Sequence, residues 1–396
     1  MINSHIHTFN SQYTPELFVK PFIKNAPNWL VRLINTVLDN KLMAFLLINA
    51  LRLNKGGIGK YASFIEIGIL SSQEQIFEKV ASAYPADTKF VVLPLGFENM
   101  GAGNVNIPYE EQLHDLFLLK RKYPSRCLPF VFIDPRMGTA TENLNFVKYY
   151  IEQKGFMGIK LYPSLGYYPF DNRLELVYKY ADEKEIPILT HCSRGGVNYG
   201  TGKVGEPVAE FVTPKSFNPQ PVAQNDPTIK YISTVGKYDF TEEWESLKDY
   251  ARFFDNTCNP DRYVDVLKKY KTLKLCFAHF GFDDQEPTDE NIIPEWHLKV
   301  LDMMEEYPNV YADISYALAT KKFWTVFNNE LPTLSAKQKD KILYGTDFFM
   351  TLQEEKGDEK TIFQKSINEL GSYFGQISNE NSVRFLTSKI WNVPPY

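Results

Sequence analysis

The sequence predicts an α/β protein, a (β/α)8 TIM barrel that occupies the whole chain, residues 1–396. Eight short apolar runs recur along the chain, and polar loops and amphipathic helices separate them. The runs are nearly continuous in apolar residues, as in parallel strands that are buried on both faces. The chain of 396 residues exceeds the roughly 250 residues of a minimal barrel, so we expect a single domain with insertions.

The predicted strands alternate with helices, which is typical of βα units around a parallel sheet. Two connections are much longer than the others, so we expect long insertions after strands 1 and 5, at about residues 10–87 and 193–272. Both leave the carboxyl end of a strand, where barrel enzymes carry their chemistry. The second insertion is rich in glycine and proline and forms either a lid or an ordinary excursion of the chain. The eight strands are expected at residues 2–9, 89–95, 128–134, 157–162, 186–191, 273–279, 310–315 and 342–347.

Three helices are marked by residues that suit the N-cap position, namely Ser72, Asp171 and Asn259. Each is followed by apolar residues three or four positions apart, so one face of each helix should pack against the sheet. The apolar stripes are Ile76, Phe77, Val80 and Tyr84; Leu174, Val177, Tyr178 and Ala181; and Tyr263, Val266, Leu267 and Tyr270.

Composition excludes several classes of protein. The chain has 43 Lys plus Arg and 48 Asp plus Glu, a net charge of −5, which argues against a nucleic-acid partner. Four scattered cysteines without CxxC spacing indicate a reduced protein rather than a disulfide scaffold. The most apolar stretch, residues 42–53, is about half of a membrane span and predicts a buried helix. We therefore expect a cytoplasmic protein without a signal peptide or membrane partner, with a small-molecule substrate, and either monomeric or a homo-oligomer.

Polar residues end several of the apolar runs. His5 and His7 form an HxH pair in the first run, and i and i+2 residues of a strand point to the same side. His191 ends the fifth run, His279 the sixth and Asp347 the eighth. An HxH pair is weak by itself, and a lone core histidine is common. Four of the six histidines at the active-site ends of strands instead predict a metal site.

Imidazoles and a carboxylate suit Zn²⁺ or another borderline divalent ion, with a position left open for water. Such an ion lowers the pKa of bound water towards neutrality, and a nearby carboxylate or imidazole can take up the proton. The residue set therefore predicts metal-assisted hydrolysis of a polarised carbonyl.

This pattern resembles the amidohydrolase superfamily of metal-dependent barrels. The GIKLYP and THCSRGG segments resemble its amidohydrolase-related branch, also called amidohydrolase 2, and VRFLTSKIWNV is similar to the family's closing helix. The resemblance implies that His5, His7, His191 and Asp347 are metal ligands and that Asp347 is also the base. It makes His279 the second catalytic residue, which lies beside the ion in one-metal members and is a ligand in two-metal members.

Lys160 has two interpretations under this resemblance. In two-metal relatives a lysine of strand four is carboxylated and bridges both ions, whereas many members of this branch keep it unmodified. We favour one metal ion and an unmodified Lys160, whose ammonium would bind an anionic substrate group. Tyr162 shares its side of the strand, and Arg194 is suited to grip a carboxylate or phosphate, so both are predicted substrate-binding residues. For Arg194 the alternative is a loop-bracing arginine.

Other polar residues are weaker candidates. Asp313 and Ser315 close the seventh run and have either a site role or local backbone bonds. His114 and His297 sit on helical patterns and are predicted to be helix-face histidines.

The leading functional hypothesis is a metal-dependent hydrolase that acts on an amide, lactone or ester. The alternative is a decarboxylase of the same branch that acts on an aromatic or unsaturated acid, since Lys160 and Arg194 suit an acid under either scheme. A barrel that has lost activity and serves in binding is a third hypothesis, and no expected ligand position is missing to support it.

Overall fold

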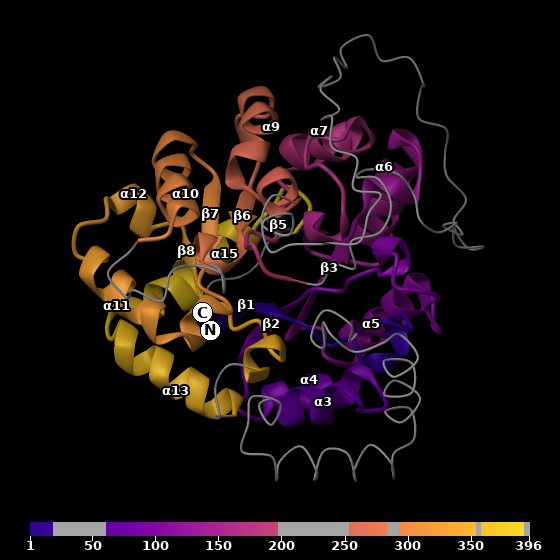
Figure 1. The fold of residues 1–396 in the computed structure, drawn as a ribbon, viewed down its shortest axis with the longest axis horizontal. Coiled ribbons are helices and arrows are strands. Elements are labelled where there is room, and N and C mark those ends of the chain that lie inside the picture. Colours follow the sequence, from indigo (N-terminus) through magenta and orange to yellow (C-terminus); the bar gives the residue numbers. More distant parts are fainter. Residues whose placement is uncertain (19–60, 197–252, 283–292, 354–357, 392–396) are drawn as a thin grey trace.

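The structure is a computed structural model that describes residues 1–18, 61–196, 253–282, 293–353 and 358–391. Its eight strands form one sheet in chain order, every neighbouring pair is parallel, and helices surround the sheet (Figure 1), which confirms the predicted barrel. The strands are β1 Ile2–Ile6, β2 Lys89–Val92, β3 Cys127–Phe132, β4 Gly158–Leu161, β5 Ile188–Thr190, β6 Leu275–Phe277, β7 Val310–Asp313 and β8 Ile342–Leu343.

The barrel closes between β1 and the segment after β8. The amide of Ser4 donates to the carbonyl of Tyr344 at 2.7 Å, and the amide of His7 donates to the carbonyl of Phe348 at 2.6 Å. Pairing with β1 thus continues beyond the two residues of β8. This closure brings the carboxyl end of β1 next to residues 344–348, at the carboxyl end of the barrel.

The three predicted N-caps are confirmed. Ser72 accepts a hydrogen bond from the amide of Gln75, and Asp171 and Asn259 each accept one from the amide two residues later. The last two caps open a 3₁₀ turn that continues into an α-helix. The helices are α3 Tyr61–Gly68, α4 Gln73–Ala81, α5 Tyr109–Lys122, α6 Ala140–Lys148, α7 Glu175–Lys184, α9 Val264–Lys269, α10 Glu295–Glu306, α11 Lys321–Glu330, α12 Ala336–Lys339, α13 Glu359–Leu370, α14 Tyr373–Gly375 and α15 Asn381–Leu386.

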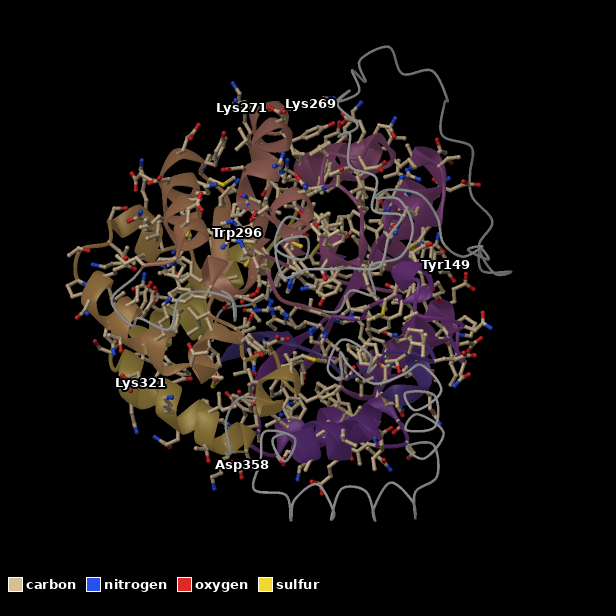
Figure 2. All side chains as sticks on the ribbon, in the orientation of Figure 1. Tyr149, Lys269, Lys271, Trp296, Lys321 and Asp358 are labelled. Atoms are coloured by element: carbon tan, nitrogen blue, oxygen red, sulfur yellow. The ribbon has the colours of Figure 1, made fainter. Side chains whose placement is uncertain are left out.

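Buried residues alternate between the two sides of the strands. Phe90 and Val92 of β2 belong to the large core between strands and helices, whereas Val91 and Leu93 belong to a smaller inner cluster. α15 contributes Phe385 to that inner cluster, so it packs on the barrel as the resemblance implied. Side chains fill the centre of the barrel, and charged groups such as Lys271 lie at the periphery (Figure 2).

Two connections between strands are much longer than the others. β1 ends at Ile6 and β2 begins at Lys89, and β5 ends at Thr190 and β6 begins at Leu275. Residues 19–60 and 197–252 lie outside the described residues, as does the apolar stretch 42–53, so the lid stays a prediction. None of the helices in the described part is long and apolar enough to cross a membrane.

Gly158 allows β4 to pack closely against its neighbours. A Cβ atom at this position would lie 2.5 Å from Phe130 Cζ and 2.7 Å from the carbonyl oxygen of Pro187. We expect Gly158→Ala to lower the free energy of unfolding by about 1–3 kcal/mol, because backbone and core must shift to admit the methyl group. Urea unfolding would measure this loss.

The matched control is Gly375→Ala. Gly375 is exposed in α14, and no atom lies within 4 Å of its added Cβ. This substitution should leave stability unchanged or raise it slightly, because alanine restricts the unfolded chain. Equal stability of Gly158→Ala and the parent protein would contradict the packing argument.

Candidate metal centre

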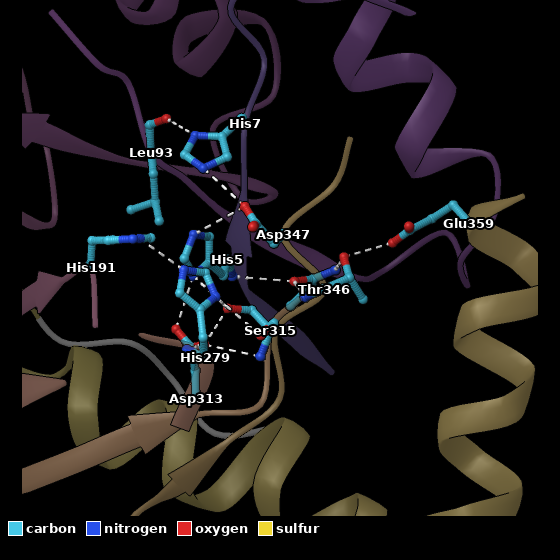
Figure 3. Close-up of polar contacts among 11 residues, drawn as sticks. His5, His7, Leu93, His191, His279, Asp313, Ser315, Thr346, Asp347 and Glu359 are labelled. Atoms are coloured by element: carbon cyan, nitrogen blue, oxygen red, sulfur yellow. Dashed lines mark hydrogen bonds and ion pairs between the residues drawn. The ribbon is translucent and has the colours of Figure 1, made fainter. Parts of the chain in front are cut away.

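The predicted ligands lie at the carboxyl ends of the strands, although the strands end earlier than the sequence suggested. His5 is within β1, and His7 follows it by one residue. His191 comes directly after β5, His279 lies in the turn after β6, and Asp347 is four residues past β8. Figure 3 shows these five side chains converging on one region.

His5, His7 and Asp347 form a compact group. One ligand atom from each lies within 4.8 Å of the others, and all three residues are buried. Asp347 Oδ1 is 3.0 Å from His7 Nε2 and 3.4 Å from His5 Nε2. Gly345 permits this approach, since its added Cβ would lie 2.7 Å from His5 Cβ. The HxH pair and the GTD aspartate thus meet as expected.

His191 pairs with His279 instead of joining that group. His279 Nε2 lies 3.0 Å from His191 Nδ1, and the His279 ring centroid is 5.4 Å from that of His5. The two histidines therefore form a second pair beside the first group. The sequence placed His191 with the HxH pair and His279 beside them, and this division into three and two was not foreseen.

In each of the four histidines, one ring nitrogen lies within hydrogen-bond distance of a carbonyl or carboxylate oxygen, which can only accept a hydrogen bond. In the neutral imidazole this nitrogen therefore carries the proton and donates it. This contact fixes the tautomer and leaves a lone pair on the other ring nitrogen. The contacts are His5 Nδ1 to Asp313 Oδ2 at 2.9 Å, His7 Nδ1 to Leu93 O at 2.7 Å, His279 Nδ1 to Ser315 O at 3.1 Å and His191 Nε2 to Gly195 O at 2.8 Å.

The ring nitrogens that keep a lone pair face atoms that are themselves hydrogen-bond acceptors. His7 Nε2 faces Asp347 Oδ1, and His279 Nε2 faces His191 Nδ1, each at 3.0 Å. His5 Nε2 and Asp347 Oδ1 are buried and have no hydrogen-bond partner among the described residues. Two nitrogen ligands of a tetrahedral zinc ion are about 3.4 Å apart at bond lengths of 2.0–2.1 Å, close to these separations. The donor set thus fits a divalent cation.

Burial sets the protonation states that a metal ion requires. It lowers the pKa of His5 to about 4 and also lowers the pKa values of His191 and His279. Burial opposes ionisation of Asp347, but the imidazoles of His5 and His7 outweigh it and hold the pKa of this carboxyl well below its usual value. Neutral imidazoles and an ionised carboxylate are the metal-binding forms of these groups.

Asp313 has the site role that the sequence left open. It accepts hydrogen bonds from His5 Nδ1 at 2.9 Å, from the amide of His279 at 3.1 Å and from the hydroxyl of Ser315. Burial raises the pKa of this carboxyl, but His5 outweighs burial and lowers it to about 2. Asp313 therefore orients His5, as the outer carboxylates of metal sites commonly do.

Left-handed backbone conformations gather around the site. His279, Phe280, Tyr316 and Asp347 have φ of 64°, 53°, 56° and 59°. Such residues persist where the surrounding structure enforces them, often at functional sites. His297 supports this turn: its Nδ1 lies 3.0 Å from the carbonyl oxygen of Phe280. His114 and His297 both lie on helices, α5 and α10, as predicted; His114 is exposed and His297 is buried.

Lys160 points into the barrel from β4. Its neighbours Ile159 and Leu161 belong to the core outside the barrel, so Lys160 occupies the inner side. It is buried, and no hydrogen bond or ion pair joins its ammonium to another described residue. Burial lowers the pKa of Lys160 to about 8, although Asp313 and Asp347 partly oppose the shift. The Tyr162 ring, 5.9 Å away, is its cation–π contact, and a buried ammonium without a hydrogen bond or counter-ion is poor core material.

Tyr162 lies beside the histidine pair, but Arg194 does not. The Tyr162 ring centroid is 4.7 Å from that of His191, and an added Cβ at Gly196 would lie 2.8 Å from the Tyr162 hydroxyl. Arg194 Nε instead donates to Asp255 at 2.9 Å, and its guanidinium stacks 4.5 Å from the Trp296 ring. These contacts support the loop-bracing interpretation of Arg194.

Three residues behind the site were missed by sequence reasoning: Asn3, Thr346 and Glu359 hydrogen-bond around the β1–β8 junction. Asn3 and Thr346 precede His5 and Asp347 closely, which is a weak signal. Nothing in the sequence distinguishes Glu359 from other helical glutamates.

A parallel barrel with buried imidazoles and a carboxylate at its carboxyl end defines the class of metal-dependent barrel enzymes. The family model described as Amidohydrolase matches residues 87–368, which is more than half of the chain. The chain therefore belongs to the amidohydrolase family, in the amidohydrolase-2 branch, whose members are metal-dependent enzymes. Among curated proteins, no sequence matches this chain.

Solved structures are similar to this chain at low sequence identity. A probable 2-pyrone-4,6-dicarboxylic acid hydrolase from Acinetobacter baumannii, with citric acid bound, is 11% identical, with a TM-score of 0.51 over 97% of this chain and 98% of that chain. A dihydroxybenzoic acid decarboxylase from Polaromonas sp. JS666, with bound manganese and 2-nitroresorcinol, is 12% identical, with a TM-score of 0.49 over 97% and 96%. At these identities the first likeness bears on the fold alone, in agreement with the barrel.

Proposed function

We propose that this protein is a metal-dependent hydrolase that acts on the amide, lactone or ester carbonyl of a small anionic substrate. The observation that carries the proposal is the convergence of imidazole lone pairs and Asp347 Oδ1, each imidazole being held from behind by an acceptor. We further propose Zn²⁺ as the ion, in one copy, with Mn²⁺ as an ion of similar preference. The four cysteines, all in the described part of the chain, form no disulfide with one another, which agrees with the proposed cytoplasmic location.

The residues divide the work as follows. His5, His7, Asp347 and His191 would hold the ion, which when bound polarises a carbonyl and lowers the pKa of water. Asp347 is ionised and would accept a proton from the attacking water. His279 Nδ1 donates a hydrogen bond to the carbonyl oxygen of Ser315, so the lone pair is on Nε2. This lone pair would take up that proton and later return it.

Substrate recognition is proposed for the inner side of β4. The Lys160 ammonium lies 5.9 Å from the centroid of the Tyr162 ring, forms no hydrogen bond or ion pair with a described residue, and would bind a carboxylate of the substrate. Tyr162 would line the same side of the pocket next to His191. Arg194 remains a weaker candidate, because Asp255 already occupies it.

A panel of carboxylated lactones, esters and amides tests this function. We expect proton release in a pH-stat from a lactone or ester, or release of an amine from an amide, with at least one substrate. Removal of the metal should lower this activity at least about 100-fold, and Zn²⁺ or Mn²⁺ should restore it. Carbon dioxide release from aromatic or unsaturated acids, without hydrolysis, would favour the decarboxylase instead, for which Lys160 is equally suited. Protein that holds no divalent ion even after reconstitution would contradict both.

A further inference from the structure

A buried carboxylate lies behind the ligand group, on the helix that follows the barrel. Glu359 begins α13, is 4% exposed and reaches Thr346 next to Asp347 (Figure 3). Its Oε1 accepts from the hydroxyl of Thr346 at 2.7 Å and from that of Tyr84 at 2.5 Å. Its Oε2 is buried without a hydrogen-bond partner, and Glu359 forms no ion pair in the described part of the chain.

The side-chain amide of Asn3 connects this carboxylate to both ends of the barrel. Its Oδ1 accepts from the amide of His5 at 3.2 Å and from the amide of Thr346 at 3.3 Å. Its Nδ2 donates to the Thr346 hydroxyl at 2.9 Å and to the Tyr84 hydroxyl at 3.0 Å. All four hydrogen bonds of the amide are thus made, which fixes its orientation.

The direction of donation in this network ends at Glu359. Since Asn3 Nδ2 can only donate, the hydroxyls of Thr346 and Tyr84 accept from it and turn their own protons to the next acceptor. That acceptor is the same atom for both, Glu359 Oε1. An apolar side chain at position 359 would therefore leave the proton of the Thr346 hydroxyl without its acceptor, and it would leave the Tyr84 hydroxyl only the Tyr344 hydroxyl, at 3.1 Å, as an acceptor.

Two metal ligands depend on the residues that this network fixes. Thr346 immediately precedes Asp347, whose φ of 59° is unfavourable for a non-glycine residue. The amides of Thr346 and Asp347 both donate to the carbonyl of His5, at 3.3 and 2.8 Å. The contacts between Asn3 and Thr346 therefore fix both the conformation of the turn at Asp347 and the position of this turn relative to β1.

We propose that Asn3, Thr346, Tyr84 and Glu359 form a positioning network that presents Asp347 and His5 to the metal ion, with Glu359 as its terminal acceptor. The network touches neither substrate nor metal and acts through the two ligands. This inference rests on the proposed function, because it assumes that Asp347 and His5 bind the ion.

Burying the Glu359 carboxylate is unfavourable for folding, and this cost supports a functional role for the residue. Burial raises the pKa of this carboxyl to about 7, since its hydrogen bonds from Tyr84 and Thr346 offset only part of the desolvation. Apolar residues at positions 84, 346 and 359 would avoid that cost. The network therefore serves to position Asp347 and His5 rather than to stabilise the fold.

The test measures Mn²⁺ affinity of the metal-free full-length protein by electron paramagnetic resonance, so it needs no substrate. Thr346→Val and Glu359→Met remove the link and the terminal acceptor, and we expect each to weaken Mn²⁺ binding about 10–100-fold. Thr346→Ser and Glu359→Gln keep the hydroxyl and an acceptor oxygen and should bind Mn²⁺ within about threefold of the parent protein. This recovery by the conservative variants separates positioning from packing.

Glu175→Met is the matched control. Glu175 is 2% exposed and likewise accepts from a tyrosine hydroxyl, that of Tyr270, and it also pairs with Lys269. It lies on α7, and among the described residues no hydrogen bond or ion pair joins it to the ligand group. This variant should lose stability in urea and keep the Mn²⁺ affinity of the parent protein.

The outcomes separate the two proposals. A parent protein that binds no Mn²⁺ overturns the proposed function and this inference with it. A parent that binds Mn²⁺, with Thr346→Val and Glu359→Met binding as tightly, overturns the network alone. Equal weakening in Glu175→Met also overturns it, because the effect would then follow general stability. If Glu359→Met fails to fold, the Thr346→Val and Thr346→Ser pair decides the question.

Discussion

Alanine at His5 is expected to weaken binding of a divalent metal ion by at least about 100-fold, more than the loss of a residue that only orients a ligand. His5 Nε2 is buried without a hydrogen-bond partner, and Asp313 holds the opposite nitrogen. The substitution removes one ligand and also leaves Asp313 with a buried charge that lacks its main partner. Elemental analysis of purified protein and Mn²⁺ titration of the metal-free form would measure the loss.

His114→Ala is the control for this prediction. His114 is exposed on α5, so its loss tests whether any histidine substitution lowers metal content. It should bind metal as the parent protein does. Full metal content in His5→Ala would refute the assignment of this histidine.

The same titration on His279→Ala counts the ions. If one ion is bound by His5, His7, His191 and Asp347, this variant keeps its metal and loses activity. If the pair of His191 and His279 holds a second ion, half of the metal is lost, because the two nitrogens lie 3.0 Å apart in a position to share it. The division of the ligands into three and two makes this comparison informative.

Methionine at Lys160 is expected to raise the stability of the metal-free protein by up to about 3 kcal/mol near pH 7. Burial lowers the pKa of Lys160 from 10.5 to about 8, so the folded state disfavours the charged form. Below pH 8 the full cost of the buried charge is present. Between pH 8 and 10.5 the folded protein has lost the proton that the unfolded chain still binds, so the parent protein gains stability and the advantage of Lys160→Met disappears.

Urea unfolding of both proteins in chelator from pH 6 to 10.5 would measure this difference. Lys274→Met is the contrasting control: its Nζ donates to the carbonyls of Arg384 at 3.0 Å and Thr387 at 2.6 Å, so its removal should destabilise the protein. Lys160→Met should at the same time weaken the binding of anionic ligands about tenfold or more. A variant less stable than the parent at pH 7 would show that the ammonium has partners that stabilise it.

The pattern of the sequence was sufficient for the architecture. Apolar runs such as 89–95 and 310–315 coincide with β2 and β7, and caps such as Ser72 begin their helices, because these signals depend on neighbours within a few residues. Polar residues at the ends of the runs identified the ligand region. The runs overestimated strand length, because pairing stops where the chain turns: β8 ends at Leu343, and Asp347 lies in a left-handed turn beyond it.

Contacts between distant segments could not be read from the sequence. Arg194 has the same chemistry whether it binds a substrate or Asp255, and only the folded chain shows which partner lies 2.9 Å away. The helical pattern places His297 on a helix face, and only the folded chain shows its Nδ1 3.0 Å from the carbonyl oxygen of Phe280. The side-chain partner in each case comes from a segment that local patterns do not connect.

By itself the sequence determined that eight buried strands would form a parallel barrel and that His5, His7, His191, His279 and Asp347 would gather at one end of it. Periodicity and strand order are local properties of the chain, and the barrel geometry follows from them. The tertiary structure alone decided which lone pairs face one another and that Asn3, Thr346 and Glu359 hold the ligands from behind. Those contacts form only when the barrel closes and brings residue 3 next to residue 346. Patterns among neighbouring residues do not encode a contact between positions so far apart in the chain.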